Sequence, residues 1–245
     1  MKQSSKRFFA ALLVTLMITG LIPGGALFII TAQAAPLSIS NIVTAVHGDG
    51  TTTDYEIDTV ITTADFQITT AHNNNTLLLQ TTESGSITVA SGVTVTLVLN
   101  GAGRESADTS PLQIGNDSVV TLVLMDDAIN SFISKTITSN ALRPQAGIHV
   151  PQDATLIIQE GYEHESPRGS SAGKLTSQGG YFAAGIGGGA NQNSGTISIE
   201  GGIIVAESNS SNSSGRNNAA GIGGGGGLTN VGGNNKTSPF AELLM

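Results

Sequence analysis

Short apolar runs recur along the chain, with β-branched and aliphatic residues at alternate positions and a turn residue at the end of each run. Four of them begin with threonine: TLVL at 96–99, TLVL at 121–124, TLII at 155–158 and TISI at 196–199. The segment Gly173–Gly180 fits the same frame and precedes the better copy that begins at Gly195. Runs of this length between glycine or polar turns predict short β-strands.

A second motif alternates with these runs. Ala146–Ile148, Ala184–Ile186 and Ala220–Ile222 share the sequence AGI and recur at nearly equal intervals. Pro111–Ile114 is a degenerate earlier copy, in which Ile114 is expected to be equivalent to Ile148. Brief strands and glycine turns that recur without helical periodicity indicate a coil that adds one rung per repeat.

The predicted fold is therefore all-β, a right-handed parallel β-helix (β-solenoid). Equivalent residues of successive rungs would stack about 4.8 Å apart and form apolar columns. Glycines would occupy the corners, where a Cβ would clash or φ is positive. We expect an N-terminal cap or irregular first rungs at 35–90, regular repeats at 91–227, and an irregular tail at 228–245. The tail either caps the coil or marks a truncated chain.

The N-terminal segment, 1–34, has the three parts of a secretion signal. Basic residues precede an apolar run at 8–30, and Ala32–Ala34 forms an A-x-A exit. The alternative is an uncleaved membrane anchor, because the apolar run is long enough to span a bilayer. Pro23–Gly25 favours cleavage after Ala34, since these residues suit a continuous membrane helix poorly. The sequence thus predicts a signal peptide at 1–34 and a protein that is secreted or displayed on the cell surface.

Composition and charge limit the classes of molecule that the mature chain can be expected to bind. Cleavage would remove three basic and no acidic residues, which moves the formal net charge from −8 to −11. An acidic chain without a basic cluster is a poor ligand for nucleic acid or anionic lipid, so neither nucleic acid nor a membrane is an expected partner of the mature chain. The absence of cysteine excludes disulfides and thiolate metal sites. No resident cofactor is expected. The one metal ion for which the sequence offers candidate ligands is Ca²⁺.

That candidate rests on three carboxylates. Asp54, Glu56 and Asp58 alternate with Tyr55 and Ile57, so a strand would place the three on one face. Carboxylate oxygens on a common face can bind Ca²⁺. The alternative is a charged strand edge that prevents aggregation.

Aromatic residues supply the candidate ligand-binding site. Sugar-binding modules use aromatic faces, and Tyr181 and Phe182 stand directly before the first AAGIGGG segment. Alternation along a strand would turn one ring inward and leave the other exposed.

No catalytic residues are predicted, and we do not expect an enzyme. A polysaccharide lyase or hydrolase would need paired acidic or basic groups. Arg143 beside Asp126 and Asp127 is the nearest such grouping. His149 is expected to be an ordinary surface histidine. The G-x-G-x-x-G match at 221–226 is interpreted as a coil corner, because the same motif occurs in an earlier repeat.

Five segments carry a family resemblance in their order along the chain: PLQIG (111–115), VTLVL (120–124), AGIHVPQDATLIIQ (146–159), AAGIGGG (183–189) and SGTISIEGGIIVA (194–206). This order resembles the glycine-rich repeats of large secreted and surface proteins of Gram-positive bacteria. Such proteins are often labelled carbohydrate-binding-domain-containing. The resemblance covers about residues 85 to 227 and implies a β-helix-like fold without catalytic residues.

The leading functional hypothesis is a non-enzymatic scaffold, spacer or adhesin that contacts a host or cell-wall surface. The alternative is a module that binds extracellular polysaccharide, with or without Ca²⁺. A polysaccharide lyase or hydrolase ranks below both.

Overall fold

The computed structural model describes residues 41–46, 52–135, 145–161, 172–209, 219–226 and 243–244. All of them lie in one unit of the chain, Ser40–Met245. Apart from one short 3-10 helix, η1 (Thr70–His72), the regular elements of this described part are β-strands. It contains no helix with the length and apolarity needed to cross a membrane. The expected signal peptide, residues 1–34, lies outside the described residues.

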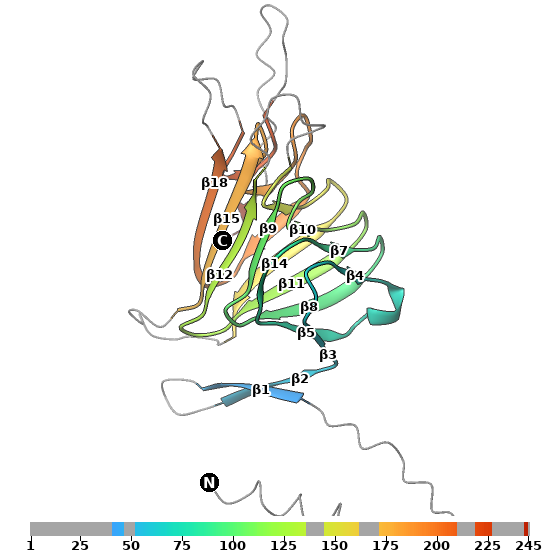
Figure 1. Ribbon diagram of the computed structural model, residues 1–245, viewed down its shortest axis with the longest axis vertical. Coiled ribbons are helices and arrows are strands. Elements are labelled where there is room, and N and C mark those ends of the chain that lie inside the picture. Colours follow the sequence, from blue (N-terminus) through green and yellow to red (C-terminus); the bar gives the residue numbers. More distant parts are fainter. Residues whose placement is uncertain are drawn as a thin grey trace, which may run out of the picture. The chain divides into compact units, whose positions relative to one another are not determined.

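Most strands belong to three parallel sheets (Figure 1). The seven-stranded sheet contains β3 (Thr59–Ile61), β5 (Thr76–Leu79), β8 (Thr94–Leu99), β11 (Val119–Leu124), β14 (Thr155–Glu160), β17 (Thr196–Ile199) and β20 (Leu243–Leu244). The five-stranded sheet contains β6 (Thr82–Ser84), β9 (Gly103–Ser106), β12 (Ile129–Ser134), β15 (Lys174–Tyr181) and β18 (Ile203–Asn209). The six-stranded sheet contains β4 (Phe66–Ile68), β7 (Ile87–Val89), β10 (Leu112–Gln113), β13 (Ile148–His149), β16 (Ile186–Gly187) and β19 (Ile222–Gly223).

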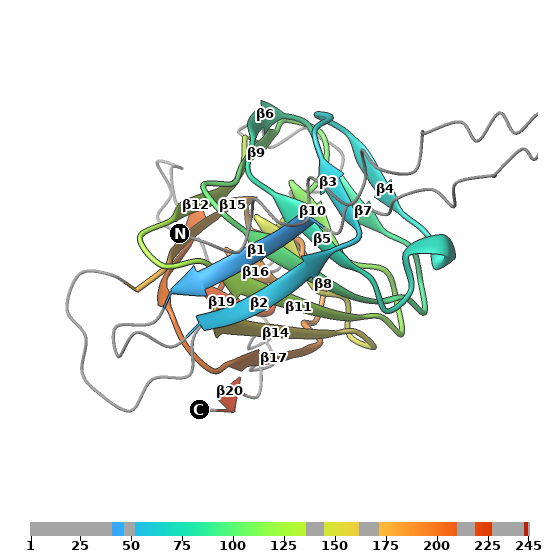
Figure 2. The same ribbon diagram turned by 90° about the horizontal axis from the view of Figure 1, so that it is seen from below.

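The chain visits these sheets in a fixed order. From β5 to β19 it passes five times through the seven-stranded, the five-stranded and then the six-stranded sheet, and we call each passage a rung. Figure 2 shows the strands in three corresponding groups. Only the first passage differs, because residues 62–65 connect β3 to β4 without a strand in the five-stranded sheet. The all-β prediction is confirmed, and parallel sheets stacked in chain order are what a β-solenoid requires.

The AGI isoleucines stack as predicted. Ile148 pairs with Ile186, and Ile186 with Ile222, in the six-stranded sheet. The residue that continues this column is Leu112, which pairs with Ile148, so the expected equivalence of Ile114 and Ile148 is wrong. Ile114 lies two positions further on and is also buried. A shift of two positions keeps every side chain on its original face, which is why the sequence pattern alone did not distinguish the two registers.

Leucines form the matching column in the seven-stranded sheet. Leu77, Leu97, Leu122 and Ile158 pair in succession and are fully buried. The threonine motifs do not all align, because Thr155 pairs with Val119 and not with Thr121.

The expected equivalence of Gly173–Gly180 and the segment that begins at Gly195 is wrong. Gly173–Gly180 falls largely within β15, which pairs with β12 and β18 in the five-stranded sheet, whereas Thr196–Ile199 lies in the seven-stranded sheet. An alternating pattern has the same appearance on every side of a coil, so it does not reveal which sheet a strand joins.

Corners use asparagine and aspartate as well as glycine. Gly92 has φ 72°, and Asp117, at the corresponding corner one rung later, has φ 58°. Short polar side chains tolerate this left-handed conformation, so the expected glycine corners are only part of the pattern. The AGI glycines have another role: a Cβ on Gly147 would lie 2.5 Å from Ser177 Oγ and 2.8 Å from Phe132 O. Close backbone approach excludes a side chain there.

A separate antiparallel hairpin, β1 (Asn41–Val46) and β2 (Thr52–Ile57), covers apolar side chains of the seven-stranded sheet that face away from the core. Ile57 packs with Leu78, Val98 and Val123. The Tyr55 hydroxyl donates a hydrogen bond of 3.1 Å to Gly161 O. Burial, and secondarily the charge of Asp126, raises the pKa of Tyr55, which keeps the hydroxyl protonated as a donor. In the region predicted as a cap, the first strands β3 to β7 already pair in register.

Candidate functional site

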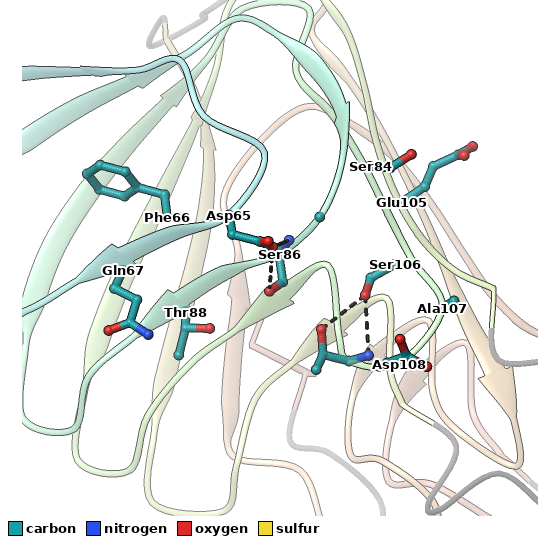
Figure 3. Close-up of a pocket in the computed structure, with 12 residues that line it drawn as sticks. Asp65, Phe66, Gln67, Ser84, Ser86, Thr88, Glu105, Ser106, Ala107 and Asp108 are labelled. Atoms are coloured by element: carbon teal, nitrogen blue, oxygen red, sulfur yellow. Dashed lines mark hydrogen bonds between the residues drawn. The ribbon is translucent and has the colours of Figure 1, made fainter.

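A polar hollow of about 580 Å³ lies where the chain turns from the five-stranded to the six-stranded sheet (Figure 3). Residues 65–67, residues 84–86 with Thr88, and residues 105–109 line it. Asp65, Gly85 and Glu105 recur at equal intervals in the sequence, one on each of three successive passages. Coiling therefore brings together residues that are distant along the chain.

Backbone contacts hold the inner wall. One oxygen of the Asp65 carboxylate, Oδ1, accepts a hydrogen bond from Ser86 N at 2.8 Å and lies 3.4 Å from Ser86 Oγ (Figure 3). Gly85 lies so close to the preceding corner that a Cβ would be 2.5 Å from Ala64 O. Phe66 N donates to Ser86 O at 3.0 Å. The Asp65 carboxylate is thus fixed at the mouth of the hollow before any ligand arrives.

The opposite wall is a tight turn. Thr109 N donates to Ser106 Oγ at 3.2 Å, and the two hydroxyl oxygens lie 3.0 Å apart. This turn carries the exposed Asp108. Glu105 forms an ion pair with the exposed Lys135.

The six-stranded sheet supplies the third side. Gln67 and Thr88 pair in register, and Figure 3 shows them across the hollow from Ser106 and Asp108. Within the described residues, the side chains of Gln67, Thr88 and Asp108 make no hydrogen bond to the protein. The half-buried Phe66 ring contacts the His72 ring edge-to-face, with centroids 5.7 Å apart. The hollow therefore offers hydrogen-bond acceptors and donors that the described residues leave free, whereas the Phe66 ring packs against the interior core.

No family model, no curated protein and no solved structure matches the chain.

The predicted calcium ligands lie elsewhere. Asp54 and Glu56 are exposed on one side of β2, while Tyr55 and Ile57 face the other. Asp58 follows the strand, and its Oδ2 accepts a 2.7 Å hydrogen bond from Thr76 N. Among the described residues, which include all three carboxylates, no three acidic, histidine or cysteine side chains form a group that could hold a metal ion. The structure gives Asp58 a role in joining the hairpin to β5.

Tyr181 and Phe182 lie at the same type of corner as the hollow, further along the coil. Tyr181 ends β15, and Phe182 leaves the strand with φ 56°. Their rings meet edge-to-face with centroids 5.4 Å apart, and both residues are half-buried. The expected inward and outward alternation is wrong, because the left-handed turn at Phe182 interrupts the strand.

His149 is not an ordinary surface histidine. It is largely buried, and its Nε2 lies 2.9 Å from Gln192 Oε1, which also accepts a hydrogen bond from Gly189 N. Because that oxygen is an acceptor, Nε2 carries the proton and donates. The other ring nitrogen, Nδ1, is buried without a partner in the described part of the chain. Burial lowers the pKa of His149, and the bond to Gln192 opposes this shift.

The G-x-G-x-x-G match and Arg143 are the remaining groups that the sequence singled out. Ile222–Gly223, within the G-x-G-x-x-G match, forms β19 of the six-stranded sheet, so the match belongs to a repeat of the coil. Arg143 lies outside the described residues. The sequence pattern did not predict the hollow, because Asp65 and Glu105 stack with Ser86 and Ser84 and no shared residue type marks these positions.

Proposed function

We propose that the mature chain is a non-enzymatic, secreted or cell-surface right-handed parallel β-helix that binds a neutral, hydroxyl-rich glycan in the hollow. The hollow carries this proposal, because its lining combines carboxylates, hydroxyls and an amide. Its volume falls within the range of about 300–1,000 Å³ typical of small-ligand sites. Right-handedness is supported by the strong preference for right-handed crossovers between parallel strands.

Sugar hydroxyls suit this lining. Ionised carboxylates accept hydrogen bonds from hydroxyl groups, and such charge-assisted bonds are the stronger ones. Asp108 and Gln67 are exposed and offer acceptors on opposite sides of the hollow.

Charge selects a neutral ligand. Asp65, Glu105 and Asp108 line the hollow, and Lys135 already pairs with Glu105. Phosphates and uronates would meet repulsion from the remaining carboxylates. Because the proposed ligand is neutral, the proposal assigns no Ca²⁺ to the hollow.

A non-catalytic role is favoured by how the carboxylates are used. Asp65 is engaged by Ser86, and Glu105 by Lys135, so neither is poised as a free acid or base. Secretion rests on the signal-like sequence at 1–34.

The scaffold, spacer or adhesin hypothesis is the second candidate. Its supporting observation is the set of in-register apolar columns, which run through every described rung and make a stiff body. A scaffold could also present the Tyr181 and Phe182 corner to a host or cell-wall surface.

Pull-down on insoluble glycans tests the proposal. The mature protein should be retained on at least one neutral polymer among cellulose, chitin, starch and mannan, equally with and without EDTA, and not on pectate. Asp108→Asn should weaken retention about tenfold or more, because a hydrogen bond to a charged group is worth about 1.5–3 kcal/mol. Tyr181→Ala is the matched control and should bind normally.

Retention only with Ca²⁺, or retention lost in Tyr181→Ala but not in Asp108→Asn, would contradict the proposal. Retention on no polymer would leave the scaffold as the better hypothesis. Release of soluble sugar from any polymer would contradict the non-enzymatic assignment.

A further inference from the structure

Arg104 is the one charged side chain that the described part of the chain buries completely. It lies on β9 in the five-stranded sheet and faces the interior, where its neighbour on the next rung is the buried Phe132. An arginine is rarely placed in such a position unless its donors are satisfied. Its partners therefore indicate what it is for.

The two terminal nitrogens of Arg104 make four hydrogen bonds. Nη1 donates to Thr81 O and Gly103 O, both at 2.8 Å. Nη2 donates to Thr63 O at 3.1 Å and to Thr81 Oγ1 at 3.2 Å. All four acceptors are carbonyl or hydroxyl oxygens, and none is a carboxylate. The guanidinium is thus a clamp on backbone, and Nε is left without a partner among the described residues.

The clamp reaches the segment that most needs support. Residues 62–65 replace the missing first strand of the five-stranded sheet, so no sheet ladder holds them there. Thr63, which Nη2 holds, lies two positions before Asp65 of the hollow. Burial lowers the pKa of Arg104, and the charges of Glu83 and then Asp65 oppose this shift without cancelling it.

We propose that Arg104 is a positioning residue that holds residues 62–65, and with them the Asp65 carboxylate, in the geometry needed for a neutral glycan to bind in the hollow. It acts without contacting the ligand. The binding part of this inference rests on the proposed function, whereas the positioning part does not.

Hydrogen–deuterium exchange measures the positioning directly and needs no ligand. Arg104→Met keeps much of the volume but removes the donors, and amide exchange across residues 63–66 should become at least tenfold faster. Leu175→Ala is the control, since Leu175 is a fully buried residue of β15, a strand that pairs with β12 and β18 and not with β9. Amide exchange at 63–66 in Leu175→Ala should match the wild type, even if the melting temperature of Leu175→Ala falls as far as that of Arg104→Met.

Affinity provides the second readout, with cellohexaose, mannohexaose and maltohexaose titrated by calorimetry. Arg104→Met should bind at least tenfold more weakly than Leu175→Ala. Arg104→Lys should recover part of the loss, because one ammonium retains the charge and some donors but not the paired geometry. If the wild type binds none of the three sugars, the proposed function fails while the exchange result still decides the positioning.

A folded Arg104→Met protein with wild-type exchange at 63–66 would overturn the inference. Should Arg104→Met not fold, Thr81→Val removes only the hydroxyl that Nη2 reaches. That variant should accelerate exchange at 63–66 about twofold to threefold, and an unchanged rate there would equally overturn the inference.

Discussion

The interior of the coil differs from one sheet to another. The inner faces of the seven-stranded and six-stranded sheets carry columns made mainly of leucine, isoleucine and valine. The inner face of the five-stranded sheet instead contains Arg104, Asn130, Ser134 and Ser177, which are four of the six buried polar residues in the described part of the chain.

These buried polar groups bind backbone at the neighbouring turns. Asn130 Oδ1 accepts from Ala102 N at 2.8 Å, and its Nδ2 donates to Lys174 O at 3.2 Å. Ser177 Oγ donates to Gly185 O at 2.8 Å. Apolar columns therefore set the spacing of the rungs, whereas polar side chains fix the paths of the corners. The hollow and the Tyr181–Phe182 pair both lie at corners that this sheet leads into.

The largest effect should come from placing a charge in an apolar column. Ile186 is fully buried between Ile148 and Ile222. Ile186→Asp should prevent folding or lower the unfolding free energy by about 4 kcal/mol or more, because an unpaired carboxylate would be buried. Urea denaturation measures the loss. Ile129→Asp, at a position 72% exposed, should cost little, and equal losses in the two variants would contradict the assigned core.

The next largest loss of stability should come from adding a Cβ where two backbone segments lie close together. A Cβ at Gly179 would lie 2.1 Å from Ala184 O, so Gly179→Ala should cost about 2–3 kcal/mol through overpacking. Gly92→Ala meets nothing within 4 Å and carries only the strain of φ 72°, about 1 kcal/mol. Thermal melts of the two variants compare these costs directly. A larger loss at Gly92 would show that conformation, and not close approach, sets the glycine requirement.

Removing a polar corner contact should cost less. Asn130→Leu leaves the Ala102 amide without its acceptor, and a buried unsatisfied donor costs about 1–3 kcal/mol. We expect faster amide exchange at residues 101–103 together with a lower urea midpoint. A more stable Asn130→Leu protein would mean that the polar interior is not needed to hold the corner.

The sequence pattern predicts the stacked repeats better than it predicts the corners between them. The AGI spacing identified the Ile148, Ile186 and Ile222 column, because one stacked residue per rung leaves a period in the sequence. It did not separate β15 from the seven-stranded sheet, since alternation is common to all sides of a coil. The corner at Asp117 has a left-handed conformation, but no glycine marks it in the sequence. The hollow was missed because each of its residues is ordinary alone, and only the three-rung stack assembles them.

The smallest predicted effect is a pH dependence at His149. Its folded-state pKa lies below the ordinary value of 6.5, so the unfolded chain takes up the proton first. The stabilising contribution is complete above about pH 6.5 and declines as the pH falls through the folded-state pKa. Urea midpoints from pH 8 to pH 5 should fall more in the wild type than in His149→Gln. Parallel curves would contradict the lowered pKa of His149.

Hydrogen–deuterium exchange mapping tests glycan binding in the hollow most directly. Hydrogen–deuterium exchange of the mature protein would be recorded with and without saturating cellohexaose, mannohexaose or maltohexaose. At least one sugar should slow exchange at residues 65–67, 84–88 and 105–109, and exchange at 181–182 should be unaffected. Protection confined to 181–182, or no protection by any of the three sugars, would contradict glycan binding in the hollow.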